Sequence, residues 1–367
     1  VAVYPITPQT SIVERISEFI ASGEMESRFI PVESEMSALY ATAGAGTTGV
    51  RTFVATARQG LLYMHEMIHW MGRGMLPTVM AVVDSGVGAP SVLGAEQDAS
   101  LSQRDTGWIQ IYCETNQEVL DTMLQAYRVA EQVSLPVMIC YDGFYLSHTS
   151  EPVCIPEIEL VDRYLPKKLA KARVGADNLN RFFGAGPGVA GTIFTAKCRR
   201  RAYEAMKIAR HVVKTADEEF EQIFGRSHGV IEGYRTEDAE VILVVTSTIT
   251  SIARPVIDML REQGKKVGLL KIRMLRPFPT EEIVAALRNA RKVAVIDRNI
   301  SPGRGGIFAT EVKAALYGKP NKPAVFGFVT GICGLAVTTE LIVDIVNHTY
   351  EHSEPESEVI WMGVPEL

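Results

Sequence analysis

The feature that most constrains the fold is a regular alternation of short apolar runs with longer helix-like segments. In the first 149 residues the apolar runs are VRTFVAT (50–56), LPTVMAVV (76–83), WIQIYC (108–113) and LPVMICYD (135–142). Helices are predicted over 8–22, 34–45, 60–73 and 117–133. Successive parallel strands need a crossover between them, which is usually a helix, so this alternation predicts a parallel α/β sheet.

The same alternation begins again near Thr236. Strands are predicted at AEVILVVTS (239–247), KVGLLKIRML (266–275) and KVAVIDR (292–298). Helices are predicted at ITSIARPVIDMLREQG (249–264), TEEIVAALRNA (280–290) and IFATEVKAAL (307–316). Gly264 stands at the predicted end of the first of these helices. Helices commonly end at a residue in the left-handed conformation, which is usually a glycine. A second parallel α/β sheet is therefore predicted.

Between the two units the alternation stops. EPVCIPEIE (151–159) and the glycine-rich FFGAGPGVAGT (182–192) predict an extended connection, and a charged helix is predicted over 197–224. We expect a first domain over 1–150, a linker with this helix over 151–234, a second domain over 235–350 and a tail over 351–367. Because VAVYPIT already has the pattern of a strand running into a loop, we also expect the first domain to be incomplete at its N-terminus.

Composition excludes several classes of protein. The 367 residues carry a formal net charge of -6, and the longest basic run is Arg199 to Arg201, so no basic stripe for nucleic acid is present. No apolar stretch approaches the roughly 18 to 20 residues that span a bilayer, and no signal segment opens the chain, so we expect a cytoplasmic protein. The five cysteines never form CxxC, so any iron-sulfur cluster must lie on another chain.

The strongest apparent metal motif is HEMIH (65–69), which matches H-E-x-x-H and would place His65 and His69 on one helix face. A zinc site needs a third ligand, and no further histidine follows at a recognisable spacing. Trp70 and Met71 follow directly, as in a packed helix. We therefore interpret this segment as a packed helix and expect no metal on this chain.

Two glycine-rich segments, GAGPGVAG (184–191) and SPGRGG (301–306), invite comparison with nucleotide-binding loops. The first lies in the linker and does not follow a strand, as the dinucleotide fingerprint requires. The second lies between a predicted strand and a predicted helix. Either the helix N-terminus there binds an anion, or the turn simply needs glycine.

Glu33 and Glu35 fall between a strand-like and a helix-like segment, and on the residues alone a carboxylate there is a helix cap. YPITP (4–8) likewise predicts a strand end followed by a proline-containing turn, with Thr7 or Thr10 capping the next helix.

Taken together, five segments give the chain a resemblance to a known family. They are YPITPQT (4–10), VESEMSA (32–38), QRDTGW (103–108), DGFYLSH (142–148) and RPFP (276–279). In order and spacing they resemble the alpha subunit of pyruvate:ferredoxin oxidoreductase and its 2-oxoacid relatives. The resemblance implies a thiamine-diphosphate-binding-like pyrimidine domain with a parallel sheet, followed by a transketolase-C-terminal-like α/β domain.

The resemblance also implies a division of labour between chains. A beta subunit would carry the diphosphate and Mg²⁺ site, and this chain has no GDG followed by NN to replace it. Gamma and ferredoxin-like subunits would supply the 4Fe-4S clusters and part of the coenzyme A site, and ferredoxin or a similar acceptor would take the electrons. The implied reaction converts a 2-oxoacid and coenzyme A to acyl-CoA and carbon dioxide.

Site residues carry over from the same segments. Glu35 would be catalytic, bonding the aminopyrimidine N1′ of the cofactor in a dry site, where a carboxyl group can relay a proton. Tyr4 and Pro5, and Gln59 from outside these segments, would join Glu35 in holding the cofactor. Thr7 would donate a hydrogen bond to the substrate carboxylate.

There is one departure from the pattern. Pyruvate-using relatives carry a carboxylate-clamping arginine after the strand at 76–83, whereas this chain has Asp84, Ser85 and Gly86. Arg58 follows the preceding strand and could replace that cation. Because both positions lie where parallel strands end, we expect Arg58 and Ser85 to face one pocket. Pyruvate is the first expectation for the substrate, a larger aryl or branched 2-oxoacid is the alternative, and a non-catalytic scaffold is the alternative of another class.

Overall fold

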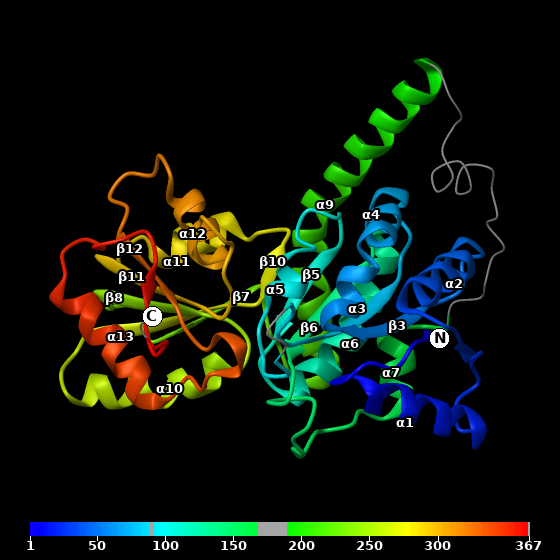
Figure 1. Ribbon diagram of the computed structural model, residues 1–367, viewed down its shortest axis with the longest axis horizontal. Coiled ribbons are helices and arrows are strands. Elements are labelled where there is room, and N and C mark those ends of the chain that lie inside the picture. Colours follow the sequence, from blue (N-terminus) through cyan, green and yellow to red (C-terminus); the bar gives the residue numbers. More distant parts are fainter. Residues whose placement is uncertain (89–91, 168–188, 366–367) are drawn as a thin grey trace.

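The computed structural model describes residues 1–88, 92–167 and 189–365. Two α/β halves lie side by side, with the N-terminal half mainly in blue to green and the C-terminal half mainly in yellow-green to red (Figure 1). Among the described helices none is long and apolar enough to cross a membrane.

The first half is built on a five-stranded sheet of order β10-β5-β6-β4-β3. Its strands are β3 (Phe53–Ala57), β4 (Val79–Asp84), β5 (Ile109–Cys113), β6 (Val137–Asp142) and β10 (Met274–Arg276), and a separate small parallel pair is formed by β1 (Ala2–Val3) and β2 (Ile30–Pro31). The strands β3 to β6 all pair in parallel, which confirms the predicted parallel sheet.

Helices cover both faces of this sheet. They are α1 (Thr10–Ala21), α2 (Glu35–Thr47), α3 (Arg58–Tyr63), α4 (His65–Gly74), α5 (Asp98–Leu101) and α6 (Asn116–Val133). Val54 and Met80 pack on the face of α2 to α4, whereas their neighbours Ala55 and Ala81 pack on the face of α6. This period of two follows from the pleat of a strand and explains why the strands are apolar throughout.

Two local predictions in this half are wrong. The single helix expected over 60–73 is interrupted at Met64 and forms α3 and α4. Neither Thr7 nor Thr10 caps α1, because the position before the helix is Gln9. The buried Gln9 side chain turns back instead, and its Nε2 donates to the Tyr4 carbonyl at 3.0 Å.

The segment between the halves contains more regular structure than expected. It includes α7 (Ile158–Tyr164), α9 (Val189–Phe224) and β7 (Ile231–Tyr234). The predicted charged helix over 197–224 is confirmed, and it begins earlier than expected, at Val189. Figure 1 shows the N-terminal part of α9 projecting beyond the body of the molecule. Most of the GAGPGVAG segment lies outside the described residues, and the domain boundaries stay predictions.

The second half is built on a six-stranded sheet of order β13-β12-β11-β8-β9-β7. Besides β7, its strands are β8 (Val241–Val245), β9 (Val267–Ile272), β11 (Lys292–Asp297), β12 (Ala324–Val329) and β13 (Ile360–Trp361). All pair in parallel except β7, which is antiparallel to β9 at one edge. The helices are α10 (Ile249–Glu262), α11 (Thr280–Leu287), α12 (Ile307–Leu316), the short 3-10 turn η1 (Ile332–Gly334) and α13 (Thr339–Glu351).

The two halves are interlocked through the chain after β9. The sequence predicted one strand over 266–275, but the chain leaves the second sheet at Arg273 and then pairs antiparallel with β5 as β10. Met274 lies opposite Ile111, so the second half donates an edge strand to the first sheet. One apolar core accordingly continues from the first half into the second.

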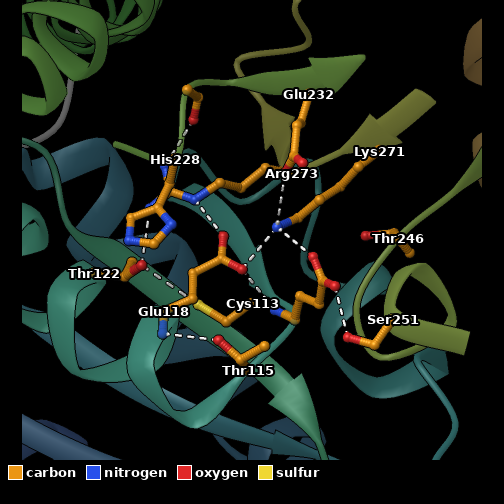
Figure 2. A network of polar contacts seen from close by, with 12 residues as sticks. Cys113, Thr115, Glu118, Thr122, His228, Glu232, Thr246, Ser251, Lys271 and Arg273 are labelled. Atoms are coloured by element: carbon orange, nitrogen blue, oxygen red, sulfur yellow. Dashed lines mark hydrogen bonds and ion pairs between the residues drawn. The ribbon is translucent and has the colours of Figure 1, made fainter. Parts of the chain in front are cut away.

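A buried ion network holds this junction (Figure 2). Lys271 Nζ lies 2.8 Å from Glu118 Oε2 and 3.0 Å from Glu114 Oε2, and Arg273 Nε lies 2.7 Å from Glu118 Oε1. Burial alone would raise the pKa of Glu118, but the charges of Lys271 and Arg273 outweigh it and lower that pKa below its usual range. Arg273, where the chain leaves the second sheet, is thereby bonded to α6 of the first half.

Candidate active site

Three neighbouring strands of the first sheet end at the same edge, where ligands bind in parallel α/β folds. Arg58 follows β3, Ser85 follows β4 and Gly143 follows β6. Arg58 Nε donates to the Gly86 carbonyl at 2.9 Å, and the Gly143 amide donates to the Asp84 carbonyl at 2.7 Å. Arg58 is 5% exposed and Ser85 is fully buried. The structure thus brings the two predicted substrate residues to one edge, with Arg58 bonded to the residue after Ser85.

Arg58 has a backbone conformation that side chains rarely adopt. Its φ is 50°, in the left-handed region, directly at the start of α3. A non-glycine residue held there costs about 1 to 3 kcal/mol, and such residues cluster at functional sites. The hydrogen bond to Gly86 is one contact that holds the strained turn in place.

Glu35 is the first residue of α2 and is buried. The helix cap is its neighbour Ser34, whose hydroxyl accepts from the Ser37 amide, while exposed Glu33 accepts from the Ser37 hydroxyl at 2.5 Å. The interpretation of Glu35 as a cap is therefore wrong, because Ser34 already fills that role. Ser34 is a preferred cap residue, whereas a glutamate is favoured in the first turn by the helix dipole, which is the position that Glu35 takes.

The Glu35 carboxylate reaches the start of α3. A methyl group added at Gly60 would lie 2.7 Å from Glu35 Oε1 and 2.8 Å from Thr56 Oγ1. Only glycine leaves space for the carboxylate at this point. Glu35 is therefore held against the same strand end, β3, from which Arg58 projects.

The YPITP segment lies beside the Ser85 loop. A methyl group added at Gly143 would be 3.0 Å from Pro8 Cγ and 3.2 Å from Ser85 Cβ, so these residues are in contact range. Tyr4, Pro5 and Thr7 are exposed, as is Gln59 in the first turn of α3. The four exposed residues are therefore available to a ligand or a partner chain, whereas Glu35, Arg58 and Ser85 are buried.

Two buried hydroxyls at this edge suit a polar ligand. Thr56 Oγ1 and Ser85 Oγ have no hydrogen-bond partner within the described part of the chain. A buried polar atom without a partner is costly, so such atoms usually bind water or a ligand. Each hydroxyl can donate one hydrogen bond and accept others. Together with the Glu35 carboxylate, they fit a cofactor that carries both donors and acceptors.

Sequence reasoning missed a pair of buried aspartates at the ends of two neighbouring strands. β4 and β6 end in Asp84 and Asp142, which lie opposite each other in the sheet. Arg298, from the end of β11, donates from Nη1 to Asp142 Oδ2 at 2.8 Å. Burial raises the pKa of Asp84 well above its usual range, and the charge of Asp142 adds to that rise. Two predicted neighbouring strands that both end in aspartate were a signal that could have found this pair.

Glu96 was also missed. Its Oε2 accepts from the Cys333 amide at 3.1 Å and lies against Gly86, where an added methyl group would approach it to 2.9 Å. Burial first, and then the charge of Asp98, raise the pKa of Glu96 to about 7. No local pattern marks Glu96, because the group it binds is 237 residues away in the sequence.

The anion site considered at SPGRGG is filled by the chain itself. Asp297 accepts hydrogen bonds from the amides of Phe308 and Ala309 in the first turn of α12, at 2.8 and 2.9 Å. A methyl group at Gly306 would lie 2.1 Å from Asp297 Oδ2. The glycine is needed so that Asp297 can reach the helix, which corrects the anion-binding alternative.

HEMIH forms part of α4, as interpreted. The His65 and His69 rings meet edge to face with centroids 4.8 Å apart, and His65 Nδ1 lies 2.7 Å from Gln103 Oε1. Across residues 1–88, 92–167 and 189–365, no group of three or more metal-binding side chains comes together.

Comparison with known proteins identifies the family. Residues 1–222 match the family model described as pyruvate flavodoxin/ferredoxin oxidoreductase, thiamine diphosphate-binding, and residues 239–342 match pyruvate:ferredoxin oxidoreductase core domain II. Pyruvate synthase subunit PorA of Methanothermobacter thermautotrophicus is 44% identical over all of this chain and 93% of its own length. Ketoisovalerate oxidoreductase subunit VorA of Pyrococcus horikoshii is 41% identical over 98% of this chain and 92% of its own.

Solved structures agree on the fold. A 2-oxoglutarate:ferredoxin oxidoreductase from Magnetococcus marinus, solved with 2-oxoglutarate, coenzyme A and succinyl-CoA bound, superposes with a TM-score of 0.67 at 18% identity, covering 95% of this chain and 61% of that one. A split-gene transketolase superposes with a TM-score of 0.52 at 14% identity, covering 96% of this chain and 91% of that one. The likeness to transketolase confirms the expected pairing of a thiamine-diphosphate-binding-like domain with a transketolase-C-terminal-like domain. The chain belongs to the pyruvate:ferredoxin oxidoreductase family, as an alpha subunit of the 2-oxoacid:ferredoxin oxidoreductases.

Proposed function

We propose that this chain supplies the pyrimidine side of a thiamine diphosphate site in a coenzyme-A-acylating 2-oxoacid:ferredoxin oxidoreductase, and that pyruvate is the substrate. The observation that carries the proposal is the convergence of buried Glu35 and buried Arg58 on the end of β3. The overall reaction converts the 2-oxoacid, coenzyme A and oxidised ferredoxin to acyl-CoA, carbon dioxide and reduced ferredoxin.

Glu35 is proposed to bond the aminopyrimidine ring of the cofactor. When bound, thiamine diphosphate supplies the carbon nucleophile and the electron sink that decarboxylation of a 2-oxoacid requires. The Glu35 carboxyl group would hold or accept a proton at a ring nitrogen, which needs a hydrogen-bonding carboxyl group in a site shielded from water. Its burial and the contact that only Gly60 permits support this role. Tyr4, Pro5 and Gln59 would complete the ring contacts from the exposed side.

Arg58, Thr7 and Ser85 are proposed to bind the substrate carboxylate. An arginine offers a charge-assisted hydrogen bond to a carboxylate, and Arg58 lies at the sheet edge next to residues 85 and 86. Its Nε donates to the Gly86 carbonyl at 2.9 Å, which holds the guanidinium beside the Ser85 loop. The Thr7 hydroxyl and the buried Ser85 hydroxyl would each add one hydrogen bond.

Pyruvate is favoured over a larger 2-oxoacid by the packing around Gly86. The missing arginine could have left a space there for a larger side chain. Instead, a methyl group at Gly86 would lie 2.7 Å from Val92 Cγ2 and 2.9 Å from Glu96 Oε2, so that side of the loop is filled. The names of the relatives alone do not decide the question, because pyruvate and ketoisovalerate subunits share about the same identity with this chain.

The remaining parts of the enzyme are proposed to lie on other chains. A beta subunit would bind the diphosphate through Mg²⁺, gamma and ferredoxin-like subunits would carry the 4Fe-4S clusters, and ferredoxin would accept the electrons. The subunit names of the relatives support a complex of several chains.

A panel of 2-oxoacids assayed on the assembled complex tests the proposal. With coenzyme A and ferredoxin present, we expect pyruvate to give the highest kcat/KM and the Arg58→Ala complex to lose about tenfold or more of it, since a charge-assisted hydrogen bond contributes roughly 1.5 to 3 kcal/mol. Unchanged kcat/KM in that variant would show that another residue holds the carboxylate. No turnover of any 2-oxoacid by the wild-type complex would favour a non-catalytic scaffold.

A further inference from the structure

A pocket outside the proposed active site lies between α4, the loop before β5, α9 and the end of β10. Its volume is about 240 Å³. Among the residues that line it are four arginines with an aromatic and a thioether side chain, namely Arg73, Arg104, Arg199, Arg276, Tyr203 and Met206. Four segments of the chain therefore each contribute one arginine to a single cavity.

The positive charge of this pocket is only partly compensated. Arg276 lies 2.6 Å from Glu311, and Arg104 lies 3.9 Å from Asp105, the one acidic residue among the described residues that line the pocket. Arg73 and Arg199 have no carboxylate partner within the described residues and belong to different helices, α4 and α9. A net excess of guanidinium groups around a concave surface favours an anionic ligand.

The pKa of His69, a residue of α4, also reflects the positive charge of this pocket. Its ring lies one helical turn before Arg73. Burial first, and then the charge of Arg73, lower the pKa of His69, and Arg199 adds to the effect against the opposing charge of Asp105. The surroundings of the pocket therefore already disfavour a further cation.

The pocket is far from the proposed active site. Gly107 and the end of α4 lie at the amino end of the first sheet, whereas Arg58 and Ser85 lie at its carboxyl end. The strands between these edges have five or six residues, which corresponds to about 17 to 20 Å. A ligand in the pocket cannot touch the groups at the carboxyl edge, so the pocket is a site of its own.

We propose that this pocket binds an organic phosphate of the size of a nucleoside monophosphate. The guanidinium groups of Arg73 and Arg199 would bind the phosphate, since an arginine fork matches two phosphate oxygens. Tyr203 and Met206 would contact the organic part, with Tyr203 offering an aromatic face. A cavity of this volume is below the usual range for a whole cofactor, which favours a small ligand that is partly exposed.

Calorimetric titration of the assembled complex tests this assignment, with adenosine 5′-monophosphate as the probe. We expect the wild-type complex to bind it, and Arg73→Ala and Arg199→Ala each to weaken binding by about tenfold or more. Arg200→Ala is the matched control, because Arg200 is the next exposed residue of α9 and does not line the pocket. Adenosine should not bind, and inorganic phosphate should bind more weakly than the monophosphate.

Three results would overturn the proposal. They are the absence of binding to the wild-type complex, equal weakening by Arg199→Ala and Arg200→Ala, and equal binding of adenosine and its monophosphate. Loss of a subunit from the Arg199→Ala complex, with the Arg200→Ala complex intact, would show that the pocket holds a partner protein instead. Because the pocket is remote from Glu35 and Arg58, none of these results depends on the proposed catalytic roles.

Discussion

Replacing Lys271 with methionine should destabilise the protein strongly, because Lys271 is the shared cation of the buried network that joins the two halves (Figure 2). The side chain is 2% exposed and lies within 3.0 Å of both Glu114 and Glu118. Burial alone would lower the pKa of Lys271, but the charges of Glu118 and Glu114 raise it, so the side chain is an ammonium ion in the fold. Methionine keeps most of the volume and removes only the charge.

The expected cost can be worked out from the partners left behind. Glu118 keeps Arg273, and Glu114 keeps Arg254 and the Ser251 hydroxyl, so neither carboxylate is left entirely alone. Removing one member of a buried ion pair typically costs about 3 to 5 kcal/mol. The remaining partners place Lys271→Met at the lower end, at about 3 kcal/mol of unfolding free energy.

Urea unfolding followed by tryptophan fluorescence measures this cost. Lys266→Met is the control. Lys266 is exposed, directly precedes β9 and lies 3.7 Å from Glu240. An exposed ion pair of this kind contributes about 1 kcal/mol or less to stability. The double variant Glu114→Gln with Lys271→Met should recover part of the loss, since it removes one of the two buried carboxylate charges that Lys271 balances. An effect of Lys271→Met no larger than that of Lys266→Met would refute the reasoning.

Two further variants extend the account. Gly60→Ala should lower turnover of the complex more than it lowers stability, because the new methyl group would lie 2.7 Å from the Glu35 carboxylate. Turnover kinetics and thermal unfolding measure the two effects separately. An unchanged kcat would contradict the predicted contact. Asp121→Asn should lower the free energy of unfolding by about 1 to 2 kcal/mol at pH 7. Burial alone would raise the pKa of Asp121, but hydrogen bonds from Arg226 and His228 lower it from 3.8 to about 2. Since this folded-state pKa lies below the unfolded value, the stabilisation is present above about pH 4 and is lost as the pH falls towards 2. The difference in unfolding free energy between wild type and variant should therefore shrink over that window, and a constant difference would argue against it.

Much of the fold could be predicted from periodicity. The apolar runs that became β4, β6 and β8 lie in sheet interiors, where every residue is buried, and such runs stand out in the sequence. Periodicity could not show that the run over 266–275 divides between two sheets, because the contacts made there join residues far apart, such as Arg273 and Glu118 at a separation of 155 residues. The edge strand β13, with two residues, was too short to leave a pattern.

The site was predicted only in part for a similar physical reason. The rule that parallel strands end at one edge was enough to bring Arg58 beside Ser85. The direction of the Glu35 side chain depends on Gly60 from another element, and the position of Glu96 depends on the Cys333 amide. Such contacts join residues far apart in the chain, and no local pattern encodes them.

The most direct test of the account is the activity of a complex assembled with Glu35→Gln, compared with Glu33→Gln as a matched control. Both changes remove one carboxylate from the same turn, but Glu35 is buried against Gly60 whereas Glu33 is exposed and bonded to Ser37. We predict that Glu35→Gln lowers kcat for pyruvate oxidation by about 100-fold or more, as loss of a positioned acid or base does, while Glu33→Gln keeps nearly wild-type turnover. A Glu35→Gln complex that folds, assembles and turns over pyruvate at the wild-type rate would contradict the central claim.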